Sequence, residues 1–388
     1  MSSRDSLVSA SGRGLGALFP QRPPPAPDAV RRILVLKPAA YGDILFATPA
    51  LSAIKRAYPG ASITLAVGKW YTELTAGIAD VDEVLDCGRF GTPGRYGWKD
   101  VWQFARAIKQ RRFDLAIVLD RSPRVAIAPW LARIHHRAGI DSSGRGFALT
   151  VRVPWDRPRH EVELMLDVVR ALGVECPAPR LKYVPTEEHE RFAARTLEEW
   201  DLTDHAPLVV IHPGGASNPG MVMPAKRWPA PRFALLADRL VDELGARIVV
   251  VGHGADQPLA RQMRLSMRHP SVDLVGQTSI GQLAALLRHS HLYIGNDSLP
   301  LHLAVAVGTP VVGMFGPTDP ALNGPYNAAG VGLVHEDACS QHRPFVPGPL
   351  TACPGCRCTE RITVDTAWAA ASRLLTSAAH QSQRPSSA

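Results

Sequence analysis

The sequence predicts an α/β fold of two doubly wound, Rossmann-like domains, each built on a parallel sheet, that face a cleft. Short apolar runs alternate with helical stretches along the chain, and this alternation starts again after about residue 185. The order is typical of βαβ units, in which helices cover both faces of a parallel sheet. The chain has 388 residues, 46% of them hydrophobic, which is enough for two such domains with separate cores.

In the first half, the predicted strands are 33–36, 63–67 and 115–119. A helix follows the first strand and its loop. It begins near Thr48, which suits an N-cap, with Pro49 at the first helical position, and it ends at the Pro-Gly pair 59–60. In the second half, the predicted strands are 208–211, 248–251, 292–294 and 311–315. Helices are expected from about residue 231, after a capping box at Ser279 and Gln282, and around 302–307.

These patterns divide the chain into four parts. Residues 1–29 are rich in Ser, Gly, Arg and Pro and are expected to form a disordered leader. Residues 30–185 form the N-terminal domain and residues 186–376 the C-terminal domain, and residues 377–388 are expected to be a loose tail. The carboxyl edges of both sheets are expected to supply the ligand site.

Composition narrows the class of partner. The formal net charge of +8 favours anionic partners such as phosphates or an anionic membrane surface. Nucleic acid is disfavoured because no basic run is interleaved with aromatic residues. No segment approaches the ~18 apolar residues of a membrane-spanning helix, and the start of the chain lacks the apolar core of a secretory signal. The expected compartment is therefore the cytoplasm.

The first candidate site is the loop after the first strand, KPAAYGDI at 37–44. Gly42 allows a close backbone approach, and Asp43 then stands at the edge of the sheet. Asp43 fits either a general base that takes a proton from an acceptor hydroxyl or a cap of the following helix. Lys37 fits either a phosphate contact or a solvated position.

Other strand-end loops carry groups that suit an anion. Gly214 and Gly215 follow His212, and their backbone N–H groups are expected either to face an anion or to form a surface turn, with Lys226 and Arg227 adding positive charge.

The sequence GNDSLPLH at 295–302 places the start of a helix after a strand, which is a natural diphosphate site. There Ser298 fits a cap or a phosphate ligand and Asp297 fits a sugar ligand, whereas His302 fits a structural role better. Thr318 and Asp319 line the site or close a turn, and Asp256 is placed to reach a ribose. The usual dinucleotide and P-loop signatures are absent.

Three segments together resemble one family. KPAAYGDILFATPALSAIKRAYPGASITLAV (37–67), HPGG with PAKRWP (212–229) and GNDSLPLHLAVAVGTPVVGMFGPTDP (295–320) are similar to the ADP-heptose:lipopolysaccharide heptosyltransferases, glycosyltransferase family 9. The likeness covers roughly residues 30–375. It implies a GT-B fold with an acceptor-binding N-terminal domain and a donor-binding C-terminal domain. It also implies an inverting glycosyl transfer that needs no metal.

The resemblance implies roles for single residues. Asp43 matches the base in the Gly-Asp loop, and Lys226 matches the lysine that neutralises the donor phosphates. Asp297 matches the acid near the donor sugar, Ser298 with the following backbone matches the diphosphate loop, and His302 matches the histidine of that helix. The chain departs from the family motif at Leu299, where the family has Gly, and in a longer loop at 216–223. Leu299 adds bulk beside the phosphates and takes a positive φ only at a cost.

The implied function is transfer of a heptose, or a similar sugar, from ADP-heptose to a lipopolysaccharide core or related glycan, peripherally on the inner face of the membrane. Nucleic acid is not an expected partner and no cofactor is expected. The alternatives are another nucleotide-sugar donor, a nucleotide-sugar epimerase, and a catalytically inactive nucleotide-sugar-binding protein. The spacing of the clustered cysteines is not a standard zinc signature and leaves either a structural metal or free thiols: Cys339, Cys353, Cys356 and Cys358.

Overall fold

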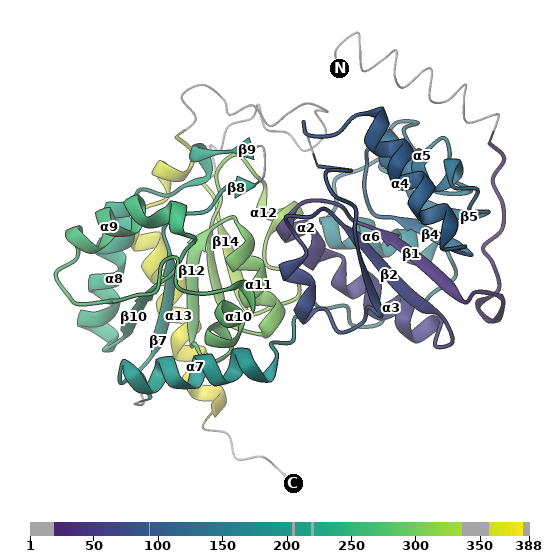
Figure 1. Cartoon of the computed structure of the whole chain (residues 1–388). Helices are drawn as coiled ribbons and strands as arrows, with labels where there is room; N and C mark the ends of the chain where they lie inside the picture. The colour runs from purple at the N-terminus through teal and green to yellow at the C-terminus, as the bar shows by residue number, and fades with distance from the viewer. Residues whose placement is uncertain (1–18, 93, 204–205, 219–220, 336–356, 383–388) are drawn as a thin grey trace. The chain divides into compact units, whose positions relative to one another are not determined.

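A computed structural model describes residues 19–382 apart from 93, 204–205, 219–220 and 336–356 (Figure 1). The chain divides into two compact units, and the main division falls between Lys182 and Tyr183. Within the described ranges, no helix is both long enough and apolar enough to cross a membrane.

Unit 1 contains a six-stranded parallel sheet of strand order β3-β2-β1-β4-β5-β6. The chain moves outward from β1 through β2 to β3 and then returns to β4 on the other side of β1. The carboxyl ends of β1 and β4 therefore form the switch point at which doubly wound sheets bind ligands. The elements are β1 (Arg32–Leu36), β2 (Ser62–Val67), β3 (Glu83–Asp86), β4 (Leu115–Val118), β5 (His136–Asp141), β6 (Val151–Pro154), α2 (Tyr41–Phe46), α3 (Thr48–Ala57), α4 (Trp98–Gln110), α5 (Pro123–Leu131) and α6 (Glu161–Arg170).

Unit 2 repeats this order with β11-β10-β7-β12-β13-β14, again all parallel, so its switch point lies at the carboxyl ends of β7 and β12. Its strands are β7 (Leu208–His212), β8 (Ser217–Asn218), β9 (Met221–Val222), β10 (Arg247–Val250), β11 (Val272–Asp273), β12 (Leu292–Asn296), β13 (Val311–Met314) and β14 (Gly330–Leu333). Its helices are α7 (Glu187–Glu199), α8 (Ala230–Leu244), α9 (Gln257–Ser266), α10 (Ile280–Arg288), α11 (Leu299–Val307), α12 (Pro320–Asn323) and α13 (Val364–Ser382), with short 3₁₀ turns at Pro224–Lys226 and Gly254–Asp256. The two parallel sheets with their helices confirm the predicted fold class.

Each unit has its own core. In unit 1, apolar residues of the central strands pack against α4 and α5. In unit 2, the strands pack against α8, α9 and α13. Trp228 anchors the second core: its ring meets that of Phe233 edge-on at 4.8 Å between centroids, and its Nε1 donates to the Ile362 carbonyl at 2.9 Å.

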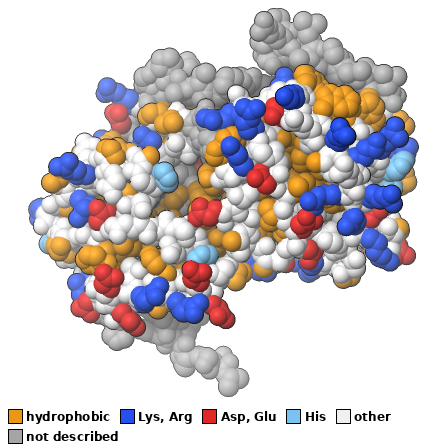
Figure 2. All heavy atoms as spheres, in the orientation of Figure 1, with side chains coloured by type: hydrophobic (Ala, Val, Ile, Leu, Met, Phe, Trp, Pro, Cys, Tyr) orange, Lys and Arg blue, Asp and Glu red, His pale blue; other side chains and the backbone are white. Residues whose placement is uncertain are grey.

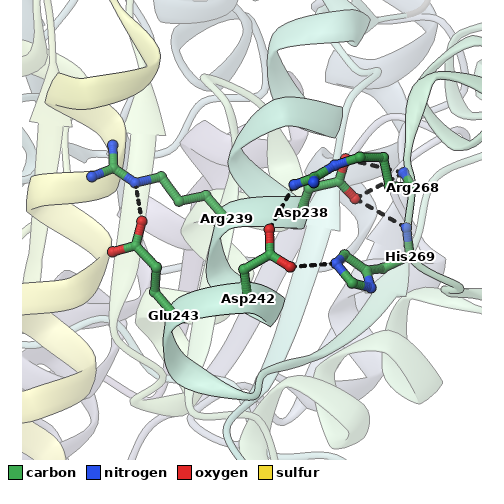
Figure 3. Close-up of polar contacts among 6 residues, drawn as sticks. All are labelled: Asp238, Arg239, Asp242, Glu243, Arg268 and His269. Carbon is green, nitrogen blue, oxygen red and sulfur yellow. Dashed lines mark hydrogen bonds and ion pairs between the residues drawn. The ribbon is translucent and has the colours of Figure 1, made fainter.

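Polar contacts fix loops on the outside of these cores. Asp238, buried on α8, accepts hydrogen bonds from the backbone N–H groups of Arg268 (2.9 Å) and His269 (3.1 Å) (Figure 3). One turn further along α8, Asp242 pairs with both side chains, at 2.6 Å from Arg268 Nη2 and 2.6 Å from His269 Nε2. The loop that follows α9 is thereby held against α8.

Local predictions in the first half need correction. The segment expected to be a loop at 37–44 contains the start of α2, so Gly42 and Asp43 are helical, with Asp43 in the first turn. Thr48 is not an N-cap. The next helix follows α2 after Ala47, which is its N-cap, and the Thr48 hydroxyl instead donates to the Leu45 carbonyl at 2.7 Å. By contrast, Ser279 caps α10 in the predicted capping box.

The ends of the chain are more ordered than predicted wherever the structure describes them. Residues 19–29 include a 3₁₀ turn at Pro27–Ala29, and the Arg22 N–H donates to the Thr150 carbonyl at 3.0 Å. Phe19 packs edge-on against Trp130 and Phe147, with centroids 5.2 and 5.6 Å away, which gives this part of the expected leader an apolar anchor. At the other end, α13 continues through residue 382, into the expected loose tail.

Candidate active site

In unit 1 the switch point gathers opposite charges. Lys37 follows β1 and is almost fully buried, and Asp120 follows β4. Lys37 Nζ lies 2.9 Å from Asp43 Oδ2 and 3.9 Å from Asp120 Oδ2, and it also donates to the Ala39 carbonyl at 2.5 Å. Burial works against the charge of the lysine, but Asp43 and Asp120 outweigh it and raise the Lys37 pKa. The ammonium therefore stays charged and holds one oxygen of Asp43.

Asp43 remains accessible despite this contact. Its side chain is 40% exposed, whereas that of Lys37 is 5% exposed. The first turn of α2 places the carboxylate at the edge of the sheet, so the Lys37 contact fixes its orientation while solvent or a ligand reaches it. This geometry suits a group that accepts a proton.

A second charged pair extends the cluster. Arg121 forms an ion pair with Glu161, the first residue of α6, and its guanidinium lies 4.2 Å from the centroid of the Trp155 ring. Burial raises the pKa of Glu161, while Arg121 opposes that shift and the negative charge of Asp43 adds to it. Sequence reasoning missed Asp120, Arg121 and Glu161. Of these three, Asp120 could have been found from the sequence, because it directly follows a predicted strand.

In unit 2 the first strand ends in a tightly packed loop. His212, the last residue of β7, lies 3.1 Å from Asp256 Oδ2 through Nε2 and 3.4 Å from Ser298 Oγ through Nδ1. Asp256 also accepts from the N–H groups of Gly215 and His253, both at 3.0 Å. Burial alone would raise the pKa of Asp256, but the hydrogen bonds from His212 and these N–H groups lower it to about 2.

This packing explains the two glycines. A Cβ on Gly214 would lie 2.2 Å from the Asp256 carboxylate. Gly215 has a φ of +84°, and a Cβ there would lie 2.7 Å from Ser298 Oγ. Asp256 thus ties the loop together with both of its oxygens, and contact with a ribose stays a prediction.

Asn296 holds both ends of the same loop. Its side chain is fully buried at the end of β12, and Nδ2 donates to the carbonyls of Pro213 (3.1 Å) and Gly214 (2.9 Å). Its Oδ1 accepts from the Trp228 N–H at 2.8 Å. The Arg227 side chain adds a bond from Nε to the Gly215 carbonyl at 3.0 Å. Asn296 was not among the predicted site residues, although it lies in the loop that follows a predicted strand.

The next residue, Asp297, gathers the predicted donor-site residues. Its Oδ2 lies 2.6 Å from Lys226 Nζ and accepts from Thr318 Oγ1 at 2.6 Å, and its Oδ1 lies 3.4 Å from His302 Nε2. Burial of Asp297 would raise its pKa, but Lys226 and His302 together lower it well below its usual range. Asp297 is therefore a buried anion that holds the lysine, while Lys226 is the more exposed partner, at 16% against 6%.

Helix α11 starts beside this pair. Ser298 is its N-cap residue, but its hydroxyl contacts His212 and the Asn296 carbonyl instead of capping the helix. Leu299 is the first helical residue, so the expected problem of a positive φ does not arise. Its N–H has no acceptor within the helix. Pro300 has no N–H, and the Leu301 N–H donates to the Ser298 carbonyl at 3.1 Å. Asp319, also predicted here, caps α12.

The predicted residues thus fall into three groups. Unit 1 holds Asp43 and Gly42 with Lys37. In unit 2, Asp256, Gly214, Gly215 and Ser298 surround His212, and Lys226, Thr318 and His302 surround Asp297. Among the described residues, no group of three His, Cys, Asp or Glu side chains could hold a metal ion. Cys339, Cys353 and Cys356 lie outside the described residues, and Cys358 is buried.

Comparison with known proteins gives independent evidence on the family of this chain. The model of glycosyltransferase family 9 (heptosyltransferase) matches residues 101–344. Lipooligosaccharide heptosyltransferase 2 of Haemophilus ducreyi is 28% identical, over 77% of this chain and 87% of its own. Lipopolysaccharide heptosyltransferase 2 of Escherichia coli is 26% identical, over 76% of this chain and 85% of its own.

Solved structures agree with the fold. The glycosyl transferase family 9 protein from Veillonella parvula is 25% identical, with a TM-score of 0.77 over 89% of this chain and 98% of its own. The E. coli ADP-heptose lipopolysaccharide heptosyltransferase II is 21% identical, with a TM-score of 0.70 over 90% of this chain and 99% of its own. With a family match over more than half of its length, the chain belongs to glycosyltransferase family 9, the heptosyltransferase family, and it is a glycosyltransferase.

Proposed function

We propose that this protein transfers a heptose from ADP-heptose to a sugar of a lipopolysaccharide core. One observation carries the proposal. Each unit holds a lysine–aspartate pair at the switch point of its sheet, but the more exposed residue of the pair is the aspartate in unit 1 and the lysine in unit 2. In unit 1 the carboxylate of Asp43 is accessible and Lys37 is buried. In unit 2 the lysine is the more accessible partner and Asp297 is buried. The exposed carboxylate of Asp43 suits the base, and the partly exposed ammonium of Lys226 suits the donor phosphates.

The donor half of the proposal rests on unit 2. Lys226 and the first N–H of α11 lie at one sheet edge, where an ammonium group and a helix N-terminus both favour a diphosphate. Asp297 would keep the lysine extended toward the ligand, and Thr318 and His302 would keep Asp297 in place. The name of the E. coli ADP-heptose lipopolysaccharide heptosyltransferase II supports ADP as the nucleotide.

The acceptor half rests on unit 1. Asp43 would take the proton of an acceptor hydroxyl while the hydroxyl oxygen forms a bond to the anomeric carbon of the heptose. The bond from that carbon to the phosphate oxygen breaks, and ADP leaves with the electron pair. Lys226 and the helix N-terminus would stabilise the charge that develops on ADP. Attack from the face opposite to ADP would invert the anomeric carbon.

The proposal assigns no cofactor to this reaction, since the charges above account for each proton and electron pair. It places the protein at the inner face of the cytoplasmic membrane, where it would reach its acceptor.

The test is product analysis. Purified protein is incubated with a heptose-deficient lipopolysaccharide core and, separately, with ADP-heptose, UDP-glucose, UDP-N-acetylglucosamine or GDP-mannose. The expected result is a core enlarged by one heptose, with release of ADP, from the first donor alone. An enlarged core from a UDP or GDP donor would overturn the choice of donor. An isomerised nucleotide-sugar, or no product from any of them, would overturn the assignment of heptosyl transfer.

A further inference from the structure

Two helices of unit 1 carry exposed tryptophans. Among the described residues four tryptophans are exposed, and three of them lie on α4 and α5: Trp98 is 53% exposed, Trp102 59% and Trp130 40%. Indole rings are among the side chains that gain most from burial, so three on neighbouring helices mark a contact surface better than a scatter of single residues.

The helices present these rings away from the core. Along α4, the residues that pack inward are Val101, Phe104, Ala105 and Ile108. Trp98 and Trp102 lie one turn apart and outside that stripe. Helix α5 packs beside α4, and its Arg124 guanidinium lies 5.7 Å from the Trp98 ring centroid, which joins the outer surfaces of the two helices.

Cations surround the tryptophans. Seven exposed basic side chains lie on or next to the two helices: Arg95, Lys99, Arg106, Lys109, Arg112, Arg124 and Arg133. Residues 94–113 and 122–135 contain a single acid, Asp100, and its carboxylate accepts the Gly97 N–H at 2.8 Å in a helix cap. Over α4 and α5, Figure 2 shows hydrophobic side chains gathered beside lysines and arginines.

We infer that this α4–α5 surface (the three tryptophans and seven cations named above) docks on an anionic lipid membrane. Tryptophan prefers the interface between headgroups and acyl chains, and each nearby Lys or Arg is attracted by anionic headgroups. Because the apolar stripe of α4 packs into the core, the part of this helix that would enter the interface is Trp98 and Trp102, with the basic side chains beside them. An acidic protein would satisfy the cations but would leave the exposed rings of Trp98 and Trp102 without an apolar environment. A nucleic acid would stack bases on such rings, and it is therefore an outcome of the test below.

The inference deepens the membrane location given in the proposed function, by naming the surface that docks, and it does not depend on the transfer reaction itself. If both hold, docking would bring the protein to the membrane that anchors its acceptor. Because binding to vesicles is measured without donor or acceptor, a failure of docking and a failure of heptosyl transfer are separate results.

The experiment is co-sedimentation of the full chain with vesicles at 50 and 300 mM salt. One set contains phosphatidylcholine with one third phosphatidylglycerol, and the other contains phosphatidylcholine alone. The variants are Trp98→Ala/Trp102→Ala and Lys99→Gln/Arg106→Gln. The control is Trp200→Ala, which removes the exposed tryptophan of unit 2. Circular dichroism and thermal melting check that every variant is folded.

We expect binding to the anionic vesicles that weakens at high salt and is much lower with phosphatidylcholine alone. The variant Trp98→Ala/Trp102→Ala should have a partition coefficient roughly tenfold lower than the wild type. The variant Lys99→Gln/Arg106→Gln should lose roughly fivefold in partition coefficient for each cation removed. Trp200→Ala should bind as the wild type does.

Two results would overturn the inference. The first is absence of binding to anionic vesicles, or loss that is equal in the variants and in Trp200→Ala. The second is vesicle binding unchanged in both variants while their binding to a nucleic acid or to poly-glutamate falls, which would assign the surface to an acidic macromolecule instead.

Discussion

Burying a lysine next to an aspartate stabilises a protein little, because desolvation of both charges offsets most of their attraction. Lys37 with Asp43 and Lys226 with Asp297 therefore need a reason other than stability. Each pair holds one member in a fixed position for a ligand. The more exposed member is the carboxylate in the first pair and the ammonium in the second, so the first site suits a group that donates a proton and the second suits an anion.

The first prediction concerns the proposed base. Asp43→Asn keeps the shape of the side chain but removes its ability to take a proton, so transfer to the acceptor should fall by about 100-fold or more. Donor binding should be unchanged, because the donor residues lie in unit 2. The measurements are the rate of glycosylated product and the ADP affinity by calorimetry. Transfer at the wild-type rate would show that another group is the base.

The second prediction concerns Lys37. Its ammonium holds one carboxylate oxygen of Asp43 at 2.9 Å, so Lys37→Met should release that oxygen and lower the rate of transfer by about tenfold or more, with ADP affinity unchanged. The measurements are the rate of glycosylated product and the ADP affinity by calorimetry, and a wild-type rate would show that Lys37 does not position Asp43. Lys55→Met, which removes a lysine paired with Asp82, is the matched control and should keep the wild-type rate.

The third prediction separates stability from binding at Lys226. Lys226→Met leaves Asp297 as a buried charge without its cation, so it should lower both ADP affinity and the free energy of unfolding, the latter by about 2 kcal/mol. Lys226→Met/Asp297→Asn should recover most of the stability but not the affinity. Urea unfolding and calorimetry give the two quantities. Wild-type ADP affinity in the double variant would remove Lys226 from the phosphate site.

At the scale of elements, the donor site depends on how the loop after β7 is held. Asp256 binds its start, Asn296 binds both its start and its end, and each glycine leaves room for a neighbouring side chain. None of these contacts requires a ligand. The loop is therefore organised before the donor arrives, which lowers the entropic cost of binding.

The fourth prediction uses the charge of Asp256. Its pKa falls from an ordinary 3.8 to about 2 in the folded protein. A depressed carboxylate pKa stabilises the fold above the unfolded value, and this stability is lost as the pH falls from about 4 toward 2. The contribution is about 2 kcal/mol. Urea unfolding of the wild type and Asp256→Asn between pH 2 and 7 should show a difference that shrinks through this window. A difference independent of pH would refute the role of the charge.

Sequence reasoning succeeded best for elements with a strong apolar signal. The four strands at the switch points, β1, β4, β7 and β12, are buried apolar runs, and all were predicted. The peripheral strands β3, β11 and β14 were missed because they are short and only partly buried or exposed. Strands β5 and β6 were also missed, because charged residues and Gly139 interrupt their apolar runs. Helix α2 was read as a loop because its six residues are too few to show a helical period. Thr48 was misassigned for the same reason, since α2 leads directly into the helix after it.

At the scale of the whole molecule, the repeated strand order predicted where the candidate residues would gather. The candidate residues all lie in segments that follow predicted strands, and the structure places such residues at the switch point of each sheet. Their partners could not be predicted, because the chain brings them from far away: Lys226 and Asp297 are 71 positions apart. Local patterns also do not reveal which of two charged residues will be buried, and here that difference separates the proposed base from the proposed phosphate ligand.

The last prediction tests how the two units divide the reaction. ADP contacts the donor residues in the proposal, so hydrogen exchange with bound ADP should slow in peptides that cover 212–228 and 295–302, where backbone N–H groups surround the switch point of unit 2. Peptides of β1 and α2 should be protected less than these. Lys226→Met/Asp297→Asn should lose most of the protection at equal ADP concentration, because its occupancy is lower. Protection confined to unit 1 would contradict the assignment of the donor to unit 2, because a bound ligand slows exchange most in the backbone segments that it stabilises against local opening.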